Sequence, residues 1–390
     1  MHSMIQCMRW FGHHDTVSLP EIKQAGCEGV VSALHQFKPG EIWPYEAISK
    51  FKRYIESFGL SWEVVESLPV HDHIKLGYPD RDVLIDHYIE SLKNLSRAGV
   101  YIVTYNFMPL LDWLRTDVAY KREDGTEILY YKKLDYQAFD IHILERENAN
   151  KDYSAEELDR IADHYNSLTE EYKEKLKNNF LLALPGDTQN FTLEYIREKT
   201  KEYGKVSKEK MKENLLYFLN RICPVADQCN MKMAIHPDDP PFSVFGLPRI
   251  VSTADDCKFL LEGANYNSNG LCFCTGSFGA RADNDLVNMI QAFGNKIHFL
   301  HLRNTKRLEN GDFYEANHLE GDANFYQIVK AILDIIHQEN RRIPMRPDHG
   351  AKMLDDLNKK CYPGYSAIGR LKGLAEIRGL EYGLIALTNK

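Results

Sequence analysis

Short apolar segments alternate with amphipathic segments along most of this chain, and that alternation strongly limits how it can fold. Apolar residues recur at helical spacing in segments such as 83–98 and 325–338. Between such segments we predict about eight short strands, at 8–12, 29–33, 61–66, 101–106, 232–236, 271–274, 298–302 and 344–347. Strands that alternate with helices form a parallel sheet, and eight such units close into a barrel. The sequence therefore predicts an α/β fold, a (β/α)8 TIM barrel, as one domain spanning residues 1–390.

Residues 110–206 interrupt the alternation between the fourth and fifth predicted strands. They contain a charged turn at 121–127 and a long charged helical stretch at 154–180, but no segment that resembles a good strand. We interpret this region as a large, mostly helical insertion near the mouth of the barrel. It would serve as a lid or a subunit contact, or it is a passive elaboration of the fold.

Composition excludes several classes of function. The chain carries a net charge of −8 and has no basic stripe, so nucleic acid is not an expected partner. No apolar stretch approaches the roughly 20 residues that a membrane span needs, and the N-terminus lacks the apolar centre of a signal peptide. Its eight cysteines include no CxxC pair. Scattered, reduced thiols are typical of a reducing compartment, so we expect a cytoplasmic protein without a membrane partner.

Four side chains that can bind a metal follow four successive predicted strands: His236, Cys274, His301 and Asp348. In parallel barrels the active site is built at the C-terminal ends of the strands, so these side chains are expected to converge. Each alone has an ordinary explanation, such as a structural histidine or a packed cysteine. Together, two imidazoles, a thiolate and a carboxylate suit Mn, Fe or Zn. An open barrel mouth leaves room for substrate oxygens, which favours Mn2+ or Fe2+ over a closed tetrahedral zinc site.

Further polar residues are expected at the same mouth. Asn106 and Arg115 lie in the segment after the fourth predicted strand, and Arg303 and Asn304 follow His301. They could bind the hydroxyl groups or the carboxylate of a small anionic substrate. The alternative for the first pair is an ordinary junction between a loop and a helix.

Tyrosines follow the eighth predicted strand, at Tyr362 and Tyr365. A tyrosine beside a metal can act as an acid or a base if its pKa is lowered. The alternative for each is a packed aromatic side chain.

Seven longer motifs, taken together, resemble the mannonate dehydratase family of the hexuronate-degradation type. They follow one another in order along nearly the whole chain. They are MRWFG (8–12), NFMPLLDWLRTD (106–117), IHPDDPP (235–241), CTGS (274–277), HLRN (301–304), RPDHG (346–350) and PGYSAIGRLKGLAE (363–376).

The resemblance implies a xylose-isomerase-like TIM barrel that dehydrates D-mannonate to 2-dehydro-3-deoxy-D-gluconate in glucuronate catabolism. The family's metal, Mn2+ or Fe2+, would be held by His236, Cys274, His301 and Asp348. Its acid and base would correspond to His349 and Tyr365, and the sequence does not indicate which is which.

Two other functions remain compatible with the sequence. They are a metal-dependent sugar isomerase or epimerase on the same fold, and a non-catalytic protein that binds a sugar acid. The insertion and the aromatic content lead us to expect a homodimer.

Overall fold

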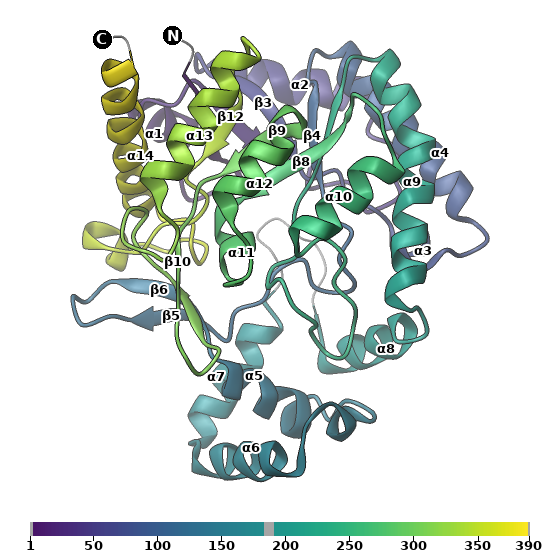
Figure 1. Ribbon diagram of the computed structural model, residues 1–390, viewed down its shortest axis with the longest axis vertical. Coiled ribbons are helices and arrows are strands. Elements are labelled where there is room, and N and C mark those ends of the chain that lie inside the picture. Colours follow the sequence, from purple (N-terminus) through teal and green to yellow (C-terminus); the bar gives the residue numbers. More distant parts are fainter. Residues whose placement is uncertain (1–2, 183–190, 389–390) are drawn as a thin grey trace.

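Eight parallel strands close into a barrel in the computed structural model, which describes residues 3–182 and 191–388 (Figure 1). Each strand pairs in parallel with both neighbours. Around the barrel they are β1 (Ile5–Arg9), β12 (Pro344–Arg346), β9 (Ile297–His301), β8 (Asn269–Cys274), β7 (Lys232–Ile235), β4 (Ile102–Tyr105), β3 (Ser61–Glu66) and β2 (Gly29–Ser32). The predicted (β/α)8 TIM barrel is therefore confirmed.

Helices surround the barrel because each buries one apolar stripe against the strands. In α13 (Phe325–Gln338), Phe325, Ile328, Ile332 and Ile336 are buried at helical spacing, and the Asn324 side chain caps the first turn. The other helices outside the barrel are α1 (Leu19–Gln24), α2 (Tyr45–Glu56), α3 (Asp72–Leu76), α4 (Arg81–Arg97), α9 (Lys208–Gln228), α10 (Ala254–Gly263), α12 (Leu286–Phe293) and α14 (Ala367–Thr388). The buried turn α11 (Thr275–Gly279) follows directly after β8.

The strand limits agree with the predicted ones to within two residues except at the N-terminus. There the strand is Ile5–Arg9 rather than 8–12, because Ile5 and Gln6 pair with Pro344 and Met345 of β12. No helix in the described part of the chain combines the length and apolar character that crossing a membrane would require.

Six strands each contribute one side chain to a small apolar layer inside the barrel. The layer consists of Cys7, Val31, Val64, Ala234, Cys272 and Phe299, all fully buried. It is separate from the larger core between the strands and the helices. This apolar layer occupies the barrel interior at its own level, so a polar site inside the barrel has to lie beyond it.

The region between β4 and β7 differs from the prediction because it contains two strands. β5 (Asp117–Lys121) and β6 (Glu127–Tyr131) form an antiparallel hairpin. The turn carries Asp124 and Gly125, a pair typical of hairpins, and Gly125 has a φ of 83°. β6 pairs in turn with β11 (Phe313–Glu315), which pairs with β10 (Thr305–Arg307).

Short helices make up the rest of this region. They are α5 (Lys133–Ala138), α6 (Ala155–Ser167), α7 (Glu170–Phe180) and α8 (Leu193–Tyr203), with helical turns at Phe139–Ile143 and Ala149–Asp152. Residues 183–190 lie outside the described residues. Figure 1 shows α5, α6 and α7 grouped at one end of the molecule, beyond β5 and β6.

Candidate active site

Polar side chains form the next layer of the barrel interior. Side chains two positions apart on a strand point to the same side. The residues two positions after the apolar layer are therefore directed inward as well. On five of the six strands they are polar or charged: Arg9, Glu66, His236, Cys274 and His301. Beyond them opens a cavity of about 810 Å3, which Arg9, Glu66 and His236 help to line.

Three of the four predicted metal ligands form a compact group. The ligand atoms of His236, Cys274 and His301 all lie within 4.8 Å of one another. Asp348 adjoins this group, with carboxylate oxygens 3.6 Å from the Cys274 sulfur and 3.9 Å from His301 Nδ1. The strand ends therefore bring together the four residues that the sequence predicted.

Hydrogen bonds orient both imidazoles of this group. His236 Nδ1 lies 2.7 Å from the Pro237 carbonyl oxygen, and His301 Nε2 lies 3.2 Å from the Glu66 carboxylate. His301 Nε2 also lies 3.1 Å from Arg346 Nε, which is a donor. In the tautomer that leaves His301 Nδ1 free for a metal, Nε2 carries the proton and donates it to Glu66, and Nδ1 of His236 likewise donates to Pro237. The two remaining nitrogens, His236 Nε2 and His301 Nδ1, face each other at 3.2 Å. Burial lowers the pKa of His236, which keeps this imidazole neutral. Two lone pairs directed at one point fit a bound cation.

The other two predicted ligands also suit a cation. The Cys274 sulfur accepts hydrogen bonds from the Ser277 amide and hydroxyl, which stabilise negative charge on it. Burial opposes the charge of Asp348, but Arg346 and His349 outweigh burial and hold the pKa of its carboxyl well below the ordinary value. Asp348 also has a φ of 63°, an unfavourable conformation for a residue with a side chain. Such strain is often found at functional sites. The donor set thus suits a divalent metal ion.

Arg346 and Glu66 support this group from across the barrel. Two Glu66 oxygens lie 3.0 and 2.8 Å from Arg346 nitrogens, and Arg346 also pairs with Asp348 at 2.5 Å. Burial alone would raise the pKa of Glu66, but Arg346 and His301 reverse this effect and lower it well below the ordinary value. Glu66 is therefore an anion that fixes the orientation of His301.

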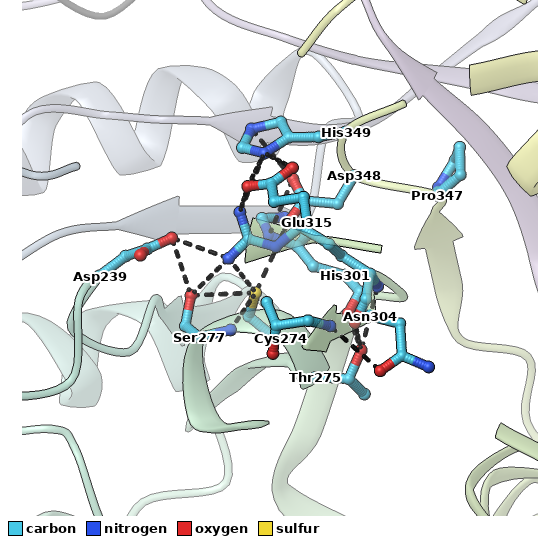
Figure 2. A network of polar contacts seen from close by, with 12 residues as sticks. Asp239, Cys274, Thr275, Ser277, His301, Asn304, Glu315, Pro347, Asp348 and His349 are labelled. Atoms are coloured by element: carbon cyan, nitrogen blue, oxygen red, sulfur yellow. Dashed lines mark hydrogen bonds and ion pairs between the residues drawn. The ribbon is translucent and has the colours of Figure 1, made fainter. Parts of the chain in front are cut away.

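His236, Cys274, His301 and Asp348 are called the metal-ligand group from here on. A second arginine, Arg303, connects this group with the acid and base candidates, His349 and Tyr365. Its guanidinium lies 2.8 Å from Asp239, 2.9 Å from Glu315 and 3.2 Å from Asp348. Figure 2 shows Asp239, Glu315 and the Cys274 sulfur grouped closely together, joined by a network of dashed lines. Burial alone would raise the pKa of Asp239, but Arg115 and Arg303 outweigh it, so the pKa is lowered. The carboxylates here are therefore ionised and paired.

His349 is held between a carboxylate and a phenol. Its Nδ1 lies 2.8 and 2.9 Å from the two Glu315 oxygens, and its Nε2 lies 3.2 Å from the Tyr365 hydroxyl. Burial raises the pKa of Tyr365 to about 12, so its hydroxyl is protonated at neutral pH. His349, Tyr365 and Asp348 all line the cavity. The arrangement places two groups that can exchange a proton beside the metal-ligand group.

The predicted substrate-binding residues fall into two groups. Asn106 and Arg303 line the cavity, and the Asn106 amide donates to Asp112 at 3.0 Å. Arg115 and Asn304 do not line it. The Arg115 side chain is fully buried in ion pairs with Asp239 and Glu315.

The Asn304 amide donates to the carbonyl oxygens of His318 and Ala323. Figure 2 shows it directed away from Glu315 and His349. The contacts of Arg115 and Asn304 are thus to protein groups that hold the loops in place, and their role in substrate binding stays a prediction.

Five charged residues of the site were not singled out by sequence reasoning: Arg9, Glu66, Asp239, Glu315 and Arg346. The sequence position of three of them could have indicated a place in the site, because Glu66 and Arg346 lie at strand ends and Asp239 is three residues past His236. The position of Glu315 gave no such indication, since it lies in a short strand within the long connection after β9.

Comparison with known proteins shows the family. The D-mannonate dehydratase (UxuA) family model matches residues 4–390. The chain belongs to the D-mannonate dehydratase family. A mannonate dehydratase of Marinomonas sp. (strain MWYL1) is 47% identical over 384 residues, which cover 96% of this chain and 98% of that protein. One of Saccharophagus degradans is 44% identical over 394 residues and 99% of both chains.

Solved structures agree with the family assignment. A crystal structure of mannonate dehydratase from Streptococcus suis serotype 2 superposes with a TM-score of 0.79. It is 31% identical, and the match covers 99% of this chain and 95% of that one. D-psicose 3-epimerase from Clostridium cellulolyticum H10 has a TM-score of 0.52 at 11% identity, over 96% of this chain and 99% of that one, so the likeness shows only a shared fold. Membership of the mannonate dehydratase family therefore disfavours the isomerase and epimerase alternative.

We expect Glu66→Gln to lower metal affinity, because the neutral amide orients His301 less firmly. Loss of such an outer hydrogen-bond partner costs about 10–100-fold in affinity. Competition with a chromogenic chelator measures the metal dissociation constant directly. Glu63→Gln on the same strand is the matched control, since Glu63 bonds to Ser61 and does not line the cavity. Equal affinities in the two variants would contradict the role of Glu66.

Proposed function

We propose that this chain dehydrates D-mannonate to 2-dehydro-3-deoxy-D-gluconate, as a metal-dependent hydro-lyase of glucuronate catabolism. The observation that supports this most directly is the shared cavity: Asp348 and His236 of the metal-ligand group line it together with His349 and Tyr365. Loss of water from a sugar acid needs a base at C2, an acid at the C3 hydroxyl and positive charge near the carboxylate. The cavity offers a candidate for each.

We propose Mn2+ or Fe2+ as the resident metal, held by His236, Cys274, His301 and Asp348. The mixture of nitrogen, sulfur and oxygen donors is typical of these transition metals and atypical of Mg2+ or Ca2+. When bound, the cation supplies positive charge that stabilises the negative charge developing on C1 and C2 as the C2 proton leaves. The C1–C2 end of the sugar acid would therefore lie next to this group.

His349 is the proposed base and Tyr365 the proposed acid. The Glu315 carboxylate accepts the Nδ1 proton of His349, which leaves a lone pair on Nε2 facing the cavity. That nitrogen removes the C2 proton, and the C–H electron pair forms the C2–C3 double bond. The Tyr365 hydroxyl gives its proton to the C3 oxygen, which leaves as water. The resulting enol then becomes the 2-keto acid as the proton of its C2 hydroxyl is replaced by one on C3.

The contact between His349 and Tyr365 then returns both side chains to their starting protonation states. After the reaction His349 holds an extra proton and Tyr365 lacks one. Their 3.2 Å separation allows the proton to pass from Nε2 to the phenolate oxygen. Arg303 and Glu315 stay paired throughout and keep the imidazole in position.

We expect Tyr365→Phe and His349→Asn each to lower the dehydration rate by about 10²–10⁴, the usual contribution of a general acid or base. Tyr362→Phe is the matched control, because Tyr362 lies three residues away and packs on Phe11. Deuterium at C2 separates the two roles. Tyr365→Phe should still exchange it with solvent, whereas His349→Asn should not, and the reverse pattern would exchange the assignments.

Mass spectrometry of D-mannonate tests the overall reaction. The chelated protein should leave the mass unchanged, and addition of Mn2+ should yield a product lighter by one water. A product of unchanged mass but altered retention would instead indicate an isomerase or epimerase. Binding without any product would indicate a protein that only binds sugar acids.

Three further proposals come from the sequence. We propose that the chain is a single domain of residues 1–390 with an insertion at 110–206, that it acts in the cytoplasm, and that it forms a homodimer. The eight cysteines are all free thiols, which supports the cytoplasm. Sedimentation equilibrium should give twice the 45.1 kDa mass of one chain, and a monomer would refute the dimer.

A further inference from the structure

Arg9 is a buried cation that none of the steps above uses. It ends β1 and lies two residues after Cys7 of the apolar layer, so its side chain is directed into the barrel. Only 6% of the residue is exposed, and it lines the cavity. Its backbone is fixed from behind, since the Arg9 carbonyl oxygen accepts a hydrogen bond from Arg370 at 2.6 Å.

The guanidinium of Arg9 is incompletely bound. Its Nη1 has no hydrogen-bond partner within the described residues 3–182 and 191–388. Its Nη2 lies 3.4 Å from His35 Nε2, and its Cζ lies over the Phe11 ring, 4.6 Å from the centroid. A buried donor without a partner is costly, and in native proteins it usually indicates a ligand or a bound water.

Charge distinguishes Arg9 from the other arginines of the cavity. Arg303 and Arg346 each pair with carboxylates within 3.2 Å. Arg9 has no carboxylate within 4.0 Å in the part of the chain that the structure describes. The carboxylate with the strongest electrostatic effect on it is that of Glu66, which Arg346 and His301 already hold.

His35 does not supply the negative charge either. Burial, followed by the charge of Arg9, lowers the pKa of His35 to about 3, so its imidazole is neutral. A neutral imidazole accepts one hydrogen bond from the guanidinium and leaves the charge uncompensated. An anion entering the cavity would compensate it, and a carboxylate is the anion for which guanidinium geometry is best suited.

Arg9 also lies next to the reacting groups. Phe11, over whose ring the guanidinium lies, contacts the Tyr365 ring with centroids 4.8 Å apart. The charge of Arg9 acts on both Tyr365 and Glu66. A sugar acid whose C2 and C3 face His349 and Tyr365 therefore has its carboxylate end within the same part of the cavity.

We propose that Arg9 binds the carboxylate of the sugar acid and so selects an acid over the corresponding neutral sugar. The inference rests on the proposed function, because it assumes that the cavity holds an aldonate. One carboxylate oxygen would accept from Nη1 of Arg9, which leaves the other free to face the metal-ligand group. Sequence reasoning did not single out Arg9, although it lies in the MRWFG motif.

Binding of two matched ligands to the metal-loaded protein tests this role. The first ligand is the 3-deoxy analogue of D-mannonate, which has no C3 hydroxyl to lose. The second is its primary amide, which has nearly the same shape without the charge. Calorimetry gives both dissociation constants for the wild type, for Arg9→Gln and for Arg9→Lys. Arg342→Gln is the matched control, since Arg342 pairs with Glu28 away from the cavity.

We expect Arg9→Gln to weaken binding of the acid by about 10–100-fold, the contribution of a charge-assisted hydrogen bond, and to change binding of the amide by less than about threefold. Arg9→Lys keeps the charge on a shorter side chain, so it should recover part of the loss. This variant also serves if the glutamine variant does not fold. Arg342→Gln should bind both ligands as the wild type does.

Equal weakening of the acid and the amide would overturn the proposal, because Arg9 would then bind hydroxyl groups or only support the fold. Unchanged binding of both ligands would overturn it as well. The test of Arg9 does not depend on whether the proposed dehydration occurs. A wild type that binds the acid but never dehydrates D-mannonate refutes the reaction, while the ratio of the two affinities still tests Arg9.

Discussion

Arg303 is bound on several sides by groups that belong to different parts of the reaction. Its guanidinium contacts Asp239, Glu315 and Asp348, and it lies 2.9 Å from His349 Nδ1. Removing this many charges from water costs several kcal/mol per ion, and a buried pair rarely repays that cost as net stability. The benefit is positional: one side chain fixes both Asp348, a candidate metal ligand, and Glu315, the partner of the proposed base. The metal-ligand group and the acid–base pair therefore cannot shift independently.

The barrel achieves this precision with a simple two-layer arrangement. One apolar layer occupies one level of the interior, and the residues two positions later on the same strands provide Arg9, Glu66, His236, Cys274 and His301. Strand geometry alone sets both the direction and the depth of these side chains. The backbone that holds them is hydrogen-bonded on both sides, so the site is built on the most rigid part of the fold.

Sequence reasoning identified correctly which side chains lie together where their position follows from a local pattern. The ligand side chains lie at strand ends, and strand ends are visible as the limits of short apolar runs. It did not foresee the contacts of Asn304 with two backbone carbonyl oxygens, because an asparagine after a strand can bind carbonyls as readily as a substrate. Sequence reasoning also missed the hairpin of β5 and β6, although Asp124-Gly125 is a local turn signal, and it missed Glu315, whose strand β11 pairs with β6 far away along the chain. Contacts of that kind depend on the completed fold and leave little local pattern.

The four-stranded sheet outside the barrel has a consequence for how the site is assembled. Glu315 is on β11, and β11 is held by β6 through the pairs Phe313–Tyr131 and Tyr314–Tyr130. More residues separate Phe313 from Tyr131 along the chain than many complete domains contain. A chain whose barrel has closed before this sheet forms would have its four candidate metal ligands in place, yet His349 would lack the carboxylate that selects its tautomer. The position of Glu315, and through it the orientation of His349, thus depends on a part of the chain that supplies none of the four candidate metal ligands.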